Sequence, residues 1–245
     1  MTTLFISDLH LQSERPHITR AFFEFLDQHA CQANALYILG DFFNLWLGDD
    51  DQTPLSLEVA SQLKQLSNQG TSVYLMHGNR DFLIGKKYCL QAGATLIKDP
   101  STIDLEGTPA LIMHGDSLCL DDRSYQRYRR IIRSPAIRLL QHVLPLSLRR
   151  RIAGNIKNQS GKAKSHKSVQ IMDVTSDEVV RQFQSHKLNL LIHGHTHRPE
   201  IHQLTHNAQN LQRIVLGDWD QLGWYLKWEA DGQHQLISFP ISQPV

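Results

Sequence analysis

Leu4-Phe5-Ile6-Ser7-Asp8-Leu9-His10 is an apolar run that leads directly to an aspartate and a histidine. Four later segments repeat this arrangement of an apolar run followed by polar residues. The polar residues are Gly40-Asp41, Gly78-Asn79-Arg80-Asp81, His114-Gly115-Asp116 and Gly194-His195-Thr196-His197. Short apolar runs are typical of buried strands, and open α/β sheets place their sites just beyond the carboxyl ends of such strands. We therefore expect these polar segments to meet at one edge of a sheet.

The residue types in these segments suit a pair of divalent metal ions. Carboxylate oxygens, imidazole nitrogens and an amide oxygen, with no thiolate among them, form a fairly hard ligand set for Mn²⁺, Fe or Zn²⁺. A carboxylate that bridges two such ions holds them about 3.5–4 Å apart, where the pair can activate water and clamp a phosphoryl group during in-line displacement. Asp41 is the candidate for the bridge. The sequence therefore predicts a two-metal hydrolytic site.

Each segment taken singly has an ordinary structural explanation. A Gly-Asp pair after a strand is usually a turn, and a lone histidine at a strand end is more often hydrogen-bonded than metal-bound. The metal hypothesis therefore rests on the presence of all the segments in a fixed order, and it needs the structural context that any motif match requires.

Length and composition favour one domain with an insertion. The chain has 245 residues, of which 41% are hydrophobic, and this is enough for one α/β domain with a substantial insertion. Three cysteines without C-x-x-C spacing, and no apolar signal segment before Leu4, lead us to expect a reduced, cytoplasmic protein. No apolar stretch approaches the ~20 residues needed to span a bilayer. Any membrane contact is therefore expected to be peripheral.

The net charge of +1 hides a strongly basic segment. Residues 123–172 contain nine Arg and four Lys and no Asp or Glu, so the segment carries +13 while the rest of the chain carries −12, from 12 basic and 24 acidic residues. With no acidic residue inside the segment to oppose them, these cations indicate an anionic partner. A nucleic-acid backbone is one such partner. However, residues 121–172 contain only Tyr125 and Tyr128 as aromatics and so lack a spaced stacking platform for single strands.

Apolar periodicity predicts helices that alternate with the strands. Residues 18–26 and 55–66 carry apolar side chains at helical spacing, and their alternation with strands through Met76 favours parallel pairing with helical crossovers. A hairpin region and a second sheet are expected further along the chain. The segments concerned are 95–97, 102–105 and 109–113 for the hairpin region, and 214–216, 225–228 and 236–239 for the strands that close the second sheet. The predicted fold class is therefore α/β, a β-sandwich flanked by helices.

Residues 121–172 are predicted to form a helical cap inserted into a core made of residues 1–120 and 173–245. Within the cap, Pro135 and Pro145 interrupt the helical pattern, and Asp121 and Asp122 are candidate N-caps. An apolar stripe is expected to pack in part on the body. It consists of Tyr125, Tyr128, Ile131 and Ile132. A further helix, rich in apolar residues, begins after Ser176 and leads back to the core.

In their order, the polar segments resemble the calcineurin-like metallophosphoesterase superfamily, whose pattern is D-x-H, G-D, G-N-[HR]-[DE], H and G-H-x-H. Within it, nearly the whole chain is similar to the UDP-2,3-diacylglucosamine hydrolase family of lipid A biosynthesis. Arg80 and the acidic run Asp49–Asp51, which follows Trp46, are more specific than the superfamily pattern. Asn44 departs from that pattern, because many members have an acidic residue there, so no ligand role is expected for it.

The resemblance implies seven metal ligands in two sets that share Asp41. The first metal would take Asp8, His10, Asp41 and His197, and the second would take Asp41, Asn79, His114 and His195. Two divalent ions are implied, for which we expect Mn²⁺, with a bridging water as the nucleophile. Arg80, Asp41 and His195 are the expected catalytic residues, with Arg80 forking onto phosphate oxygens as charge builds. His193 is expected to support the strand end.

The implied reaction is hydrolysis of UDP-2,3-diacylglucosamine at the α-phosphate, which gives UMP and 2,3-diacylglucosamine 1-phosphate, called lipid X. The implied substrate contacts are Asn79, Arg80, Asp122, Ser160, Lys164, Lys167 and His195. Lys164 and Lys167 lie about one helical turn apart and can face a diphosphate together. The cap also has more apolar residues than short helices need for packing, and we expect some of them to line an acyl groove. These residues are Ile137, Leu139, Leu140, Val143, Leu144, Leu146, Leu148 and Ile152.

The resemblance and the basic cap together imply a monomer that lies on the cytoplasmic face of the inner membrane, where each surface cation contributes about 1 kcal/mol next to anionic lipid. No nucleic-acid partner is expected. Two alternatives remain open. One is a different dimetal phosphodiesterase that acts on a nucleic acid or nucleotide. The other is a non-catalytic interaction module that has lost its metals, although every expected ligand is present in this chain.

Overall fold

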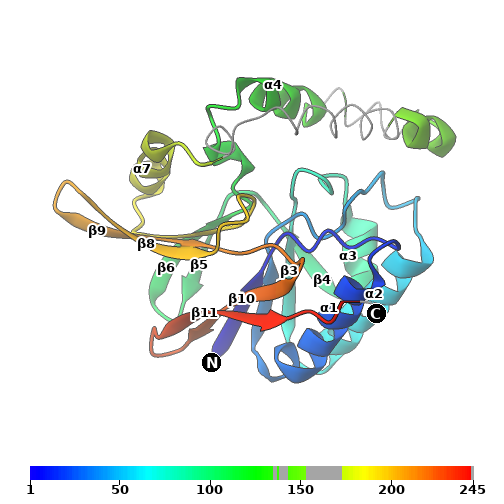
Figure 1. The fold of residues 1–245 in the computed structure, drawn as a ribbon, viewed down its shortest axis with the longest axis horizontal. Coiled ribbons are helices and arrows are strands. Elements are labelled where there is room, and N and C mark those ends of the chain that lie inside the picture. Colours follow the sequence, from blue (N-terminus) through cyan, green and yellow to red (C-terminus); the bar gives the residue numbers. More distant parts are fainter. Residues whose placement is uncertain (135–136, 138–142, 153–172, 244–245) are drawn as a thin grey trace.

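Two β-sheets pack face to face in the computed structural model, which describes residues 1–134, 137, 143–152 and 173–243. The first sheet has six strands in the order β11-β10-β1-β2-β3-β4. Their bounds are β1 (Thr2–Ile6), β2 (Ala35–Ile38), β3 (Ser72–Met76), β4 (Ala94–Ile97), β10 (Leu222–Glu229) and β11 (His234–Pro240). The strands β1 to β4 pair in parallel, whereas β10 pairs antiparallel with both β1 and β11. Figure 1 shows this sheet with the chain coloured along its length.

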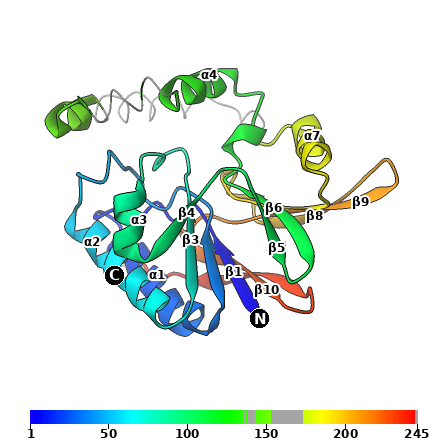
Figure 2. The same ribbon diagram turned by 180° about the vertical axis from the view of Figure 1, so that it is seen from behind.

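The second sheet has five strands in the order β5-β6-β7-β9-β8. Their bounds are β5 (Ser101–Leu105), β6 (Thr108–Met113), β7 (Leu190–His193), β8 (Glu200–His206) and β9 (Gln209–Val215). The three central strands β6, β7 and β9 are parallel, and both edge strands are antiparallel to their neighbours. In Figure 2 the molecule is seen from behind, with the green β5–β6 hairpin in front.

Helices cover the outer faces of the sandwich (Figures 1 and 2). The helices α1 (Pro16–Gln28), α2 (Pro54–Asn68) and α3 (Lys86–Ala92) lie on the first sheet, and α7 (Ser176–His186) lies on the second. The helix α2 starts with a capping box in which Thr53 and Ser56 exchange hydrogen bonds. Two short 3₁₀ helices also occur in the described residues, η1 at Ala30–Gln32 and η2 at Asp116–Leu118. The predicted helices at 18–26 and 55–66 are thus confirmed as the central parts of α1 and α2.

Alternate strand residues enter different layers of the core, as the pleat requires. In β1, Leu4 and Ile6 pack in the layer under α1, whereas Phe5 packs between the sheets with residues such as Ile112 and Ile192. Each such fully buried side chain stabilises the fold by about 1.5–3 kcal/mol. Because both faces of the central strands are covered, their carboxyl ends are the places where polar side chains can converge.

Sheet membership differs from the sequence prediction in two places. Residues 102–105 and 109–113 form the expected hairpin, with a tight turn at Glu106 and Gly107, but residues 95–97 belong to β4 at the edge of the other sheet. Residues 225–228 and 236–239 were predicted to close the second sheet and lie instead in β10 and β11 of the first. The reason is that β10 pairs with β1, which lies more than 200 residues away in the chain. Local sequence patterns do not encode which distant strand a given strand pairs with.

The basic segment begins with the helix α4 (Arg123–Ile132). This helix lies over the edge where the central strands end (Figures 1 and 2). Its N-cap is Asp122, whose carboxylate accepts a hydrogen bond from the Tyr125 backbone nitrogen at 3.0 Å. Asp121 instead accepts a hydrogen bond from the Arg123 backbone at its carbonyl. Of the predicted apolar stripe, Tyr128 and Ile131 are 41% and 61% exposed, so only part of it packs on the body.

Four cations of the basic segment pair with carboxylates of the core, which corrects the expectation that the segment is unopposed. Arg129 and Arg133 lie against Asp99 and Asp116, with Arg129 Nε at 2.7 Å from Asp116 Oδ2. Residues 146–152 are also helical. There, Arg149 pairs with Asp50 and Arg150 with Asp51. Asp50 and Asp51 of the acidic run therefore anchor part of the insertion.

The rest of the predicted cap lies outside the described residues, namely residues 135–136, 138–142 and 153–172. The division into a core and a cap at 121–172 consequently stays a prediction. No helix in the described part of the chain is long and apolar enough to cross a membrane.

Candidate metal centre

The predicted site segments converge at one edge of the sandwich. They follow β1, β2, β3, β6 and β7, and backbone hydrogen bonds join the loops beyond these strands. The Asp8 nitrogen donates to the Gly40 carbonyl at 3.1 Å, and the His10 nitrogen donates to the Asp41 carbonyl at 2.9 Å. The Gly194 nitrogen donates to the His114 carbonyl at 2.9 Å, which ties the loops of the second sheet together. The side chains that these loops carry are therefore held close to one another by the backbone.

Left-handed backbone conformations gather at the predicted ligands. Non-glycine residues rarely adopt positive φ, at a cost of roughly 1–2 kcal/mol per residue, and such strain clusters at functional sites. Five of the seven predicted ligands have it. They are Asp8 (φ 57°), His10 (φ 50°), Asp41 (φ 50°), His195 (φ 70°) and His197 (φ 56°). Backbone strain thus occurs at the positions where the sequence predicts metal ligands.

Two glycines permit the close approach of the ligand loops. A Cβ at Gly78 would lie 2.1 Å from the Asp41 nitrogen, and a Cβ at Gly194 would lie 2.3 Å from Asp8 Oδ2. Neither loop could come so near with a side chain in place. These contacts explain why glycine precedes Asn79 and His195.

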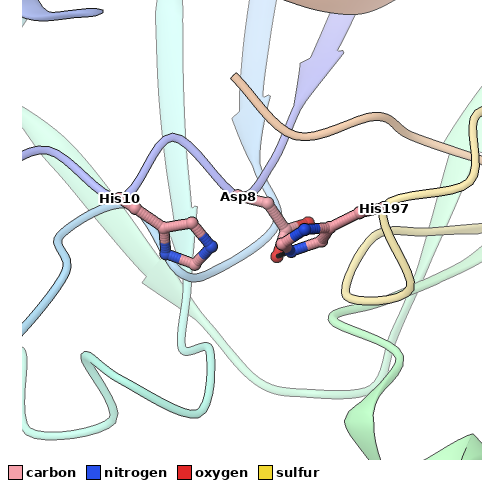
Figure 3. Close-up of side chains that lie close together, drawn as sticks. All are labelled: Asp8, His10 and His197. Carbon is pink, nitrogen blue, oxygen red and sulfur yellow. Dashed lines mark ion pairs between the residues drawn. The ribbon is translucent and has the colours of Figure 1, made fainter. Parts of the chain in front are cut away.

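The first predicted ligand set forms one compact group (Figure 3). Asp8, His10 and His197 each offer a ligand atom, and these atoms all lie within 4.8 Å of one another. His197 Nε2 is 3.5 Å from Asp8 Oδ1, and His10 Nδ1 is 3.8 Å from Asp41 Oδ2. Asp41 thus lies next to this group, as its predicted shared position requires.

A second group shares Asp8 with the first and adds Asp41 and His114. Ligand atoms of Asp8, Asp41 and His114 also lie within 4.8 Å of one another. His114 Nε2 is 3.8 Å from Asp41 Oδ1 and 3.0 Å from Asn79 Oδ1, while its Nδ1 bonds the Leu39 carbonyl at 2.9 Å. The His195 ring lies edge-on to the His114 ring with 5.0 Å between centroids. The structure therefore brings all seven predicted ligands to one place.

Unsatisfied buried atoms indicate that this cluster suits a cation. Asp8 is fully buried and His10 is 9% exposed. Asp8 Oδ1 and both ring nitrogens of His10 have no hydrogen-bond partner within the described part of the chain. Burying polar atoms without partners is costly, and native proteins satisfy most of them. A pair of divalent ions would satisfy these atoms, so the donor set fits the metals that the sequence predicts.

Burial and neighbouring charges determine the pKa values of the clustered side chains. Burial lowers the pKa of His10 to about 3 and that of His195 to about 4, so both rings are neutral and able to bind a metal at pH 7. Burial raises the pKa of Asp41 to about 7. For His114, burial acts to lower the pKa, but the Asp41 and Asp8 carboxylates outweigh it and raise the pKa to about 9. A metal ion would therefore compete with protons at Asp41 and His114.

Arg80 is fixed beside the expected bridging carboxylate. Its backbone nitrogen donates to Asp41 Oδ1 at 2.8 Å, and its Nε lies 3.5 Å from Asp41 Oδ2. Its Nη1 donates to Asn44 Oδ1 at 2.5 Å, and Asn44 in turn donates to Gln12 Oε1 at 2.6 Å. Asn44, for which no ligand role was expected, thus holds the Arg80 guanidinium.

The helix α4 contacts the ligand loops directly. The Tyr125 ring stacks on the His195 ring with 6.1 Å between centroids, and its hydroxyl donates to Asp116 Oδ2 at 2.6 Å. Arg133 Nη2 donates to the Gly78 carbonyl at 2.9 Å, next to the predicted ligand Asn79. These contacts place the start of the basic segment over the candidate metal centre.

The remaining predicted substrate contacts are only partly described. Asp122 lies at the N-cap of α4, where Ser124 also donates to its carboxylate at 2.7 Å. Ser160, Lys164 and Lys167 lie outside the described residues, as do Leu139 and Leu140 of the predicted acyl groove. Val143, Leu148 and Ile152 of that groove are 72%, 41% and 43% exposed.

Three carboxylates support the site without having been assigned a role from the sequence, although Asp81 and Asp49 lie in segments that the sequence singled out. Buried Asp81 accepts hydrogen bonds from the backbone of Gly78 and Phe42 at 2.8 Å each, and so shapes the Asn79 loop. Asp49 accepts hydrogen bonds from the backbone of Gly85, the N-cap of α3, and of Tyr88 in its first turn. Asp218 lies 3.2 Å from His197. A signal for Asp218 was present, because Gly217-Asp218 follows the apolar run 214–216 just as Gly40-Asp41 follows 36–39.

Comparison with known proteins gives consistent matches over almost the whole chain. The family model for calcineurin-like phosphoesterases matches residues 1–199. A UDP-2,3-diacylglucosamine hydrolase of Pseudomonas aeruginosa (strain UCBPP-PA14) is 52% identical over 241 residues, which cover 98% of this chain and 100% of that protein. The enzyme of the same name from Azotobacter vinelandii is 51% identical over 242 residues, with 98% and 100% covered. That from Ectopseudomonas mendocina is 52% identical over 232 residues, with 95% and 96% covered.

Proposed function

The chain belongs to the calcineurin-like phosphoesterase family and, within it, to the UDP-2,3-diacylglucosamine hydrolases, and from this premise we propose its reaction and the roles of its residues. It hydrolyses the pyrophosphate bond of UDP-2,3-diacylglucosamine at the α-phosphate and releases UMP and 2,3-diacylglucosamine 1-phosphate, a step of lipid A biosynthesis. The observation that supports this most strongly is the convergence of buried carboxylates and imidazoles beside Arg80 at one edge of the sandwich.

Seven side chains hold two divalent metal ions, proposed to be Mn²⁺. Asp8, His10, Asp41 and His197 hold one ion, and Asp41, Asn79, His114 and His195 hold the other. When bound, the two ions polarise the reacting phosphate and activate a water molecule for in-line attack. The neutral amide of Asn79 limits the negative charge of the cluster, and the His114 bond to the Leu39 carbonyl fixes the direction of that ring.

Arg80 stabilises the charge that builds on the phosphate oxygens. Asp41 and Asn44 hold its guanidinium, which has further N–H donors for a substrate phosphate. Because arginine stays protonated at any working pH, this help does not depend on a proton equilibrium. Asn79 and His195 both lie next to His114 and are proposed to contact the same phosphate.

The basic segment provides the rest of the substrate site. Asp122, Ser160, Lys164 and Lys167 contact the nucleotide and diphosphate, and apolar residues between Ile137 and Ile152 line the acyl chains. The remaining cations, apart from the four arginines that pair with the core, lie against anionic lipid, so the protein acts as a peripheral monomer on the cytoplasmic face of the inner membrane. The exposed Tyr128 and Ile131 of α4, flanked by arginines, agree with such a surface.

The decisive experiment measures UMP release from UDP-2,3-diacylglucosamine with and without added Mn²⁺, after removal of metals with a chelator. We expect cleavage that depends on metal and that clearly exceeds cleavage of a small aryl phosphodiester in kcat/KM. A preference for RNA, for DNA or for the small ester would instead support a different dimetal phosphodiesterase. Full cleavage by metal-free protein would refute the dimetal mechanism.

A further inference from the structure

Asp218 reaches the candidate metal centre from a strand that supplies none of the predicted ligands. The strand β9 pairs in parallel with β7, with His193 opposite Val215, so both strands end at the same edge. Two residues beyond the end of β9, Gly217 leads to Asp218. This placement repeats the arrangement by which β2 delivers Asp41.

The contact of Asp218 is with one ring nitrogen of His197. Asp218 Oδ2 lies 3.2 Å from His197 Nδ1, whereas the other nitrogen, Nε2, lies 3.5 Å from Asp8 Oδ1 in the ligand group. A neutral imidazole carries its proton on only one nitrogen, and a carboxylate partner decides which. With the proton on Nδ1 facing Asp218, the lone pair of Nε2 faces the ligand group.

Asp218 is itself held firmly relative to Asp8. The next residue, Trp219, is 1% exposed, its backbone nitrogen donates to the Asp8 carbonyl at 3.2 Å, and its indole donates to the Trp224 carbonyl at 3.0 Å. His197 lies in a loop, and its side chain is 35% exposed, about as much as the 34% of the Asp218 side chain. The ring therefore depends on a carboxylate whose neighbour in the chain, Trp219, is hydrogen-bonded to the Asp8 backbone.

We propose that Asp218 is a positioning residue that fixes His197 with its proton on Nδ1 and thereby presents Nε2 to the first metal ion. The inference rests on the metal role proposed above for His197, and it goes beyond that role by naming the group that orients the ring. Partners of this kind raise the basicity of the ligand, and their loss typically lowers metal affinity by about 10–100-fold.

The test compares Asp218→Asn and Asp218→Ala with a matched control, Asp220→Asn. Asp220 lies two residues away, pairs with Arg15 and is 60% exposed at its side chain. We expect the Asp218 variants to bind the first metal ion roughly 10–100-fold more weakly in a titration with Mn²⁺, while the second ion stays bound. The control should bind both ions like the wild type. Unchanged affinity in Asp218→Ala would overturn the proposal.

Two further measurements separate this proposal from the one on which it rests. His197→Ala should weaken binding of the first ion more than Asp218→Asn does, and adding Asp218→Asn to it should weaken that binding no further, since Asp218 acts through the ring. If His197→Ala kept two ions per chain, the ligand assignment itself would be wrong.

Nitrogen-15 NMR of the wild-type protein loaded with Zn²⁺ tests the position of the His197 proton directly and does not depend on the folding of a variant. A His197 proton on Nδ1 is expected, and a proton on Nε2 would refute the role of Asp218.

Discussion

The candidate metal centre lies at one edge of the sandwich, here called the metal edge. Its residues and those of the basic segment are held in place in different ways. At the metal edge, ligands are held by backbone geometry, with left-handed residues and close glycine contacts immediately beyond strand ends. The helix α4 is held by side chains, through Arg129 and Arg133 against Asp99 and Asp116. The first arrangement permits little movement of its charges, whereas the second depends on a few ion pairs. This contrast agrees with our proposal that the edge supplies the chemistry and the basic segment supplies the substrate preference.

The strongest test of the metal edge is Asp41→Asn. Because an amide replaces the proposed bridging carboxylate, we expect activity to be abolished and both metal ions to be lost. Asp8→Ala, at the same edge, should chiefly empty the first site. Metal analysis of the purified variants measures this difference. Metal content near two ions per chain in an inactive Asp41→Asn protein would contradict the bridging role.

Arg80→Ala separates catalysis from metal binding within the same edge. We expect kcat to fall by roughly 10²–10³-fold, because a donor to transition-state charge is lost, while metal content stays intact. Arg80→Lys should recover little, since an ammonium cannot fork onto two oxygens. Steady-state kinetics and metal analysis of the same preparations test this. A kcat within about threefold of wild type would show that Arg80 does not stabilise the transition state and has a structural role instead.

Metal binding at this edge should also depend on pH. Metals bind deprotonated ligands, and the pKa of Asp41 is raised to about 7 and that of His114 to about 9 before metal binds. At pH 8 the ions displace a proton chiefly from His114 and at pH 6 from Asp41 as well, so the second ion, which needs both groups deprotonated, should bind roughly 10³-fold more weakly at pH 6. Titration calorimetry at several pH values measures this. Constant affinity over this range would mean that neither group binds the metal.

The anchor of α4 gives the corresponding test for the basic segment. Arg133→Met leaves Asp116, which is fully buried, with Arg129 as its remaining cation, so we expect a loss of unfolding free energy below the about 3–5 kcal/mol of a buried charge left with no partner. Arg150→Met is the matched control, because Arg150 is 60% exposed in its pair with Asp51 and such solvent-exposed pairs contribute little to stability. Urea unfolding of both variants measures the difference. Equal losses would show that α4 is not held by its buried pairs.

The same contrast explains what the sequence could predict. Each ligand from Asp8 to His197 lies within a few residues of a strand end, so short motifs located it, and parallel strands brought the ends together. The pairing of β10 with β1 and that of Arg149 with Asp50 join residues about 100 or more positions apart, which no local pattern encodes. Asp218 is an intermediate case. Its Gly-Asp signal was visible, but its partner His197 was known only once the fold was known.

The smallest expected effect concerns Lys164 and Lys167, which lie outside the described residues. Changing both to Met should lower kcat/KM for UDP-2,3-diacylglucosamine by roughly tenfold or more, because binding energy far from the reacting phosphate is lost. Cleavage of a small aryl phosphodiester should hardly change, since that ester needs only the metal edge. Changing Lys86 and Lys87 of α3 in the same way is the matched control for net charge. If both substrates lost activity equally, the basic segment would not act as a receptor for the lipid nucleotide, and the generic phosphodiesterase would become the better hypothesis.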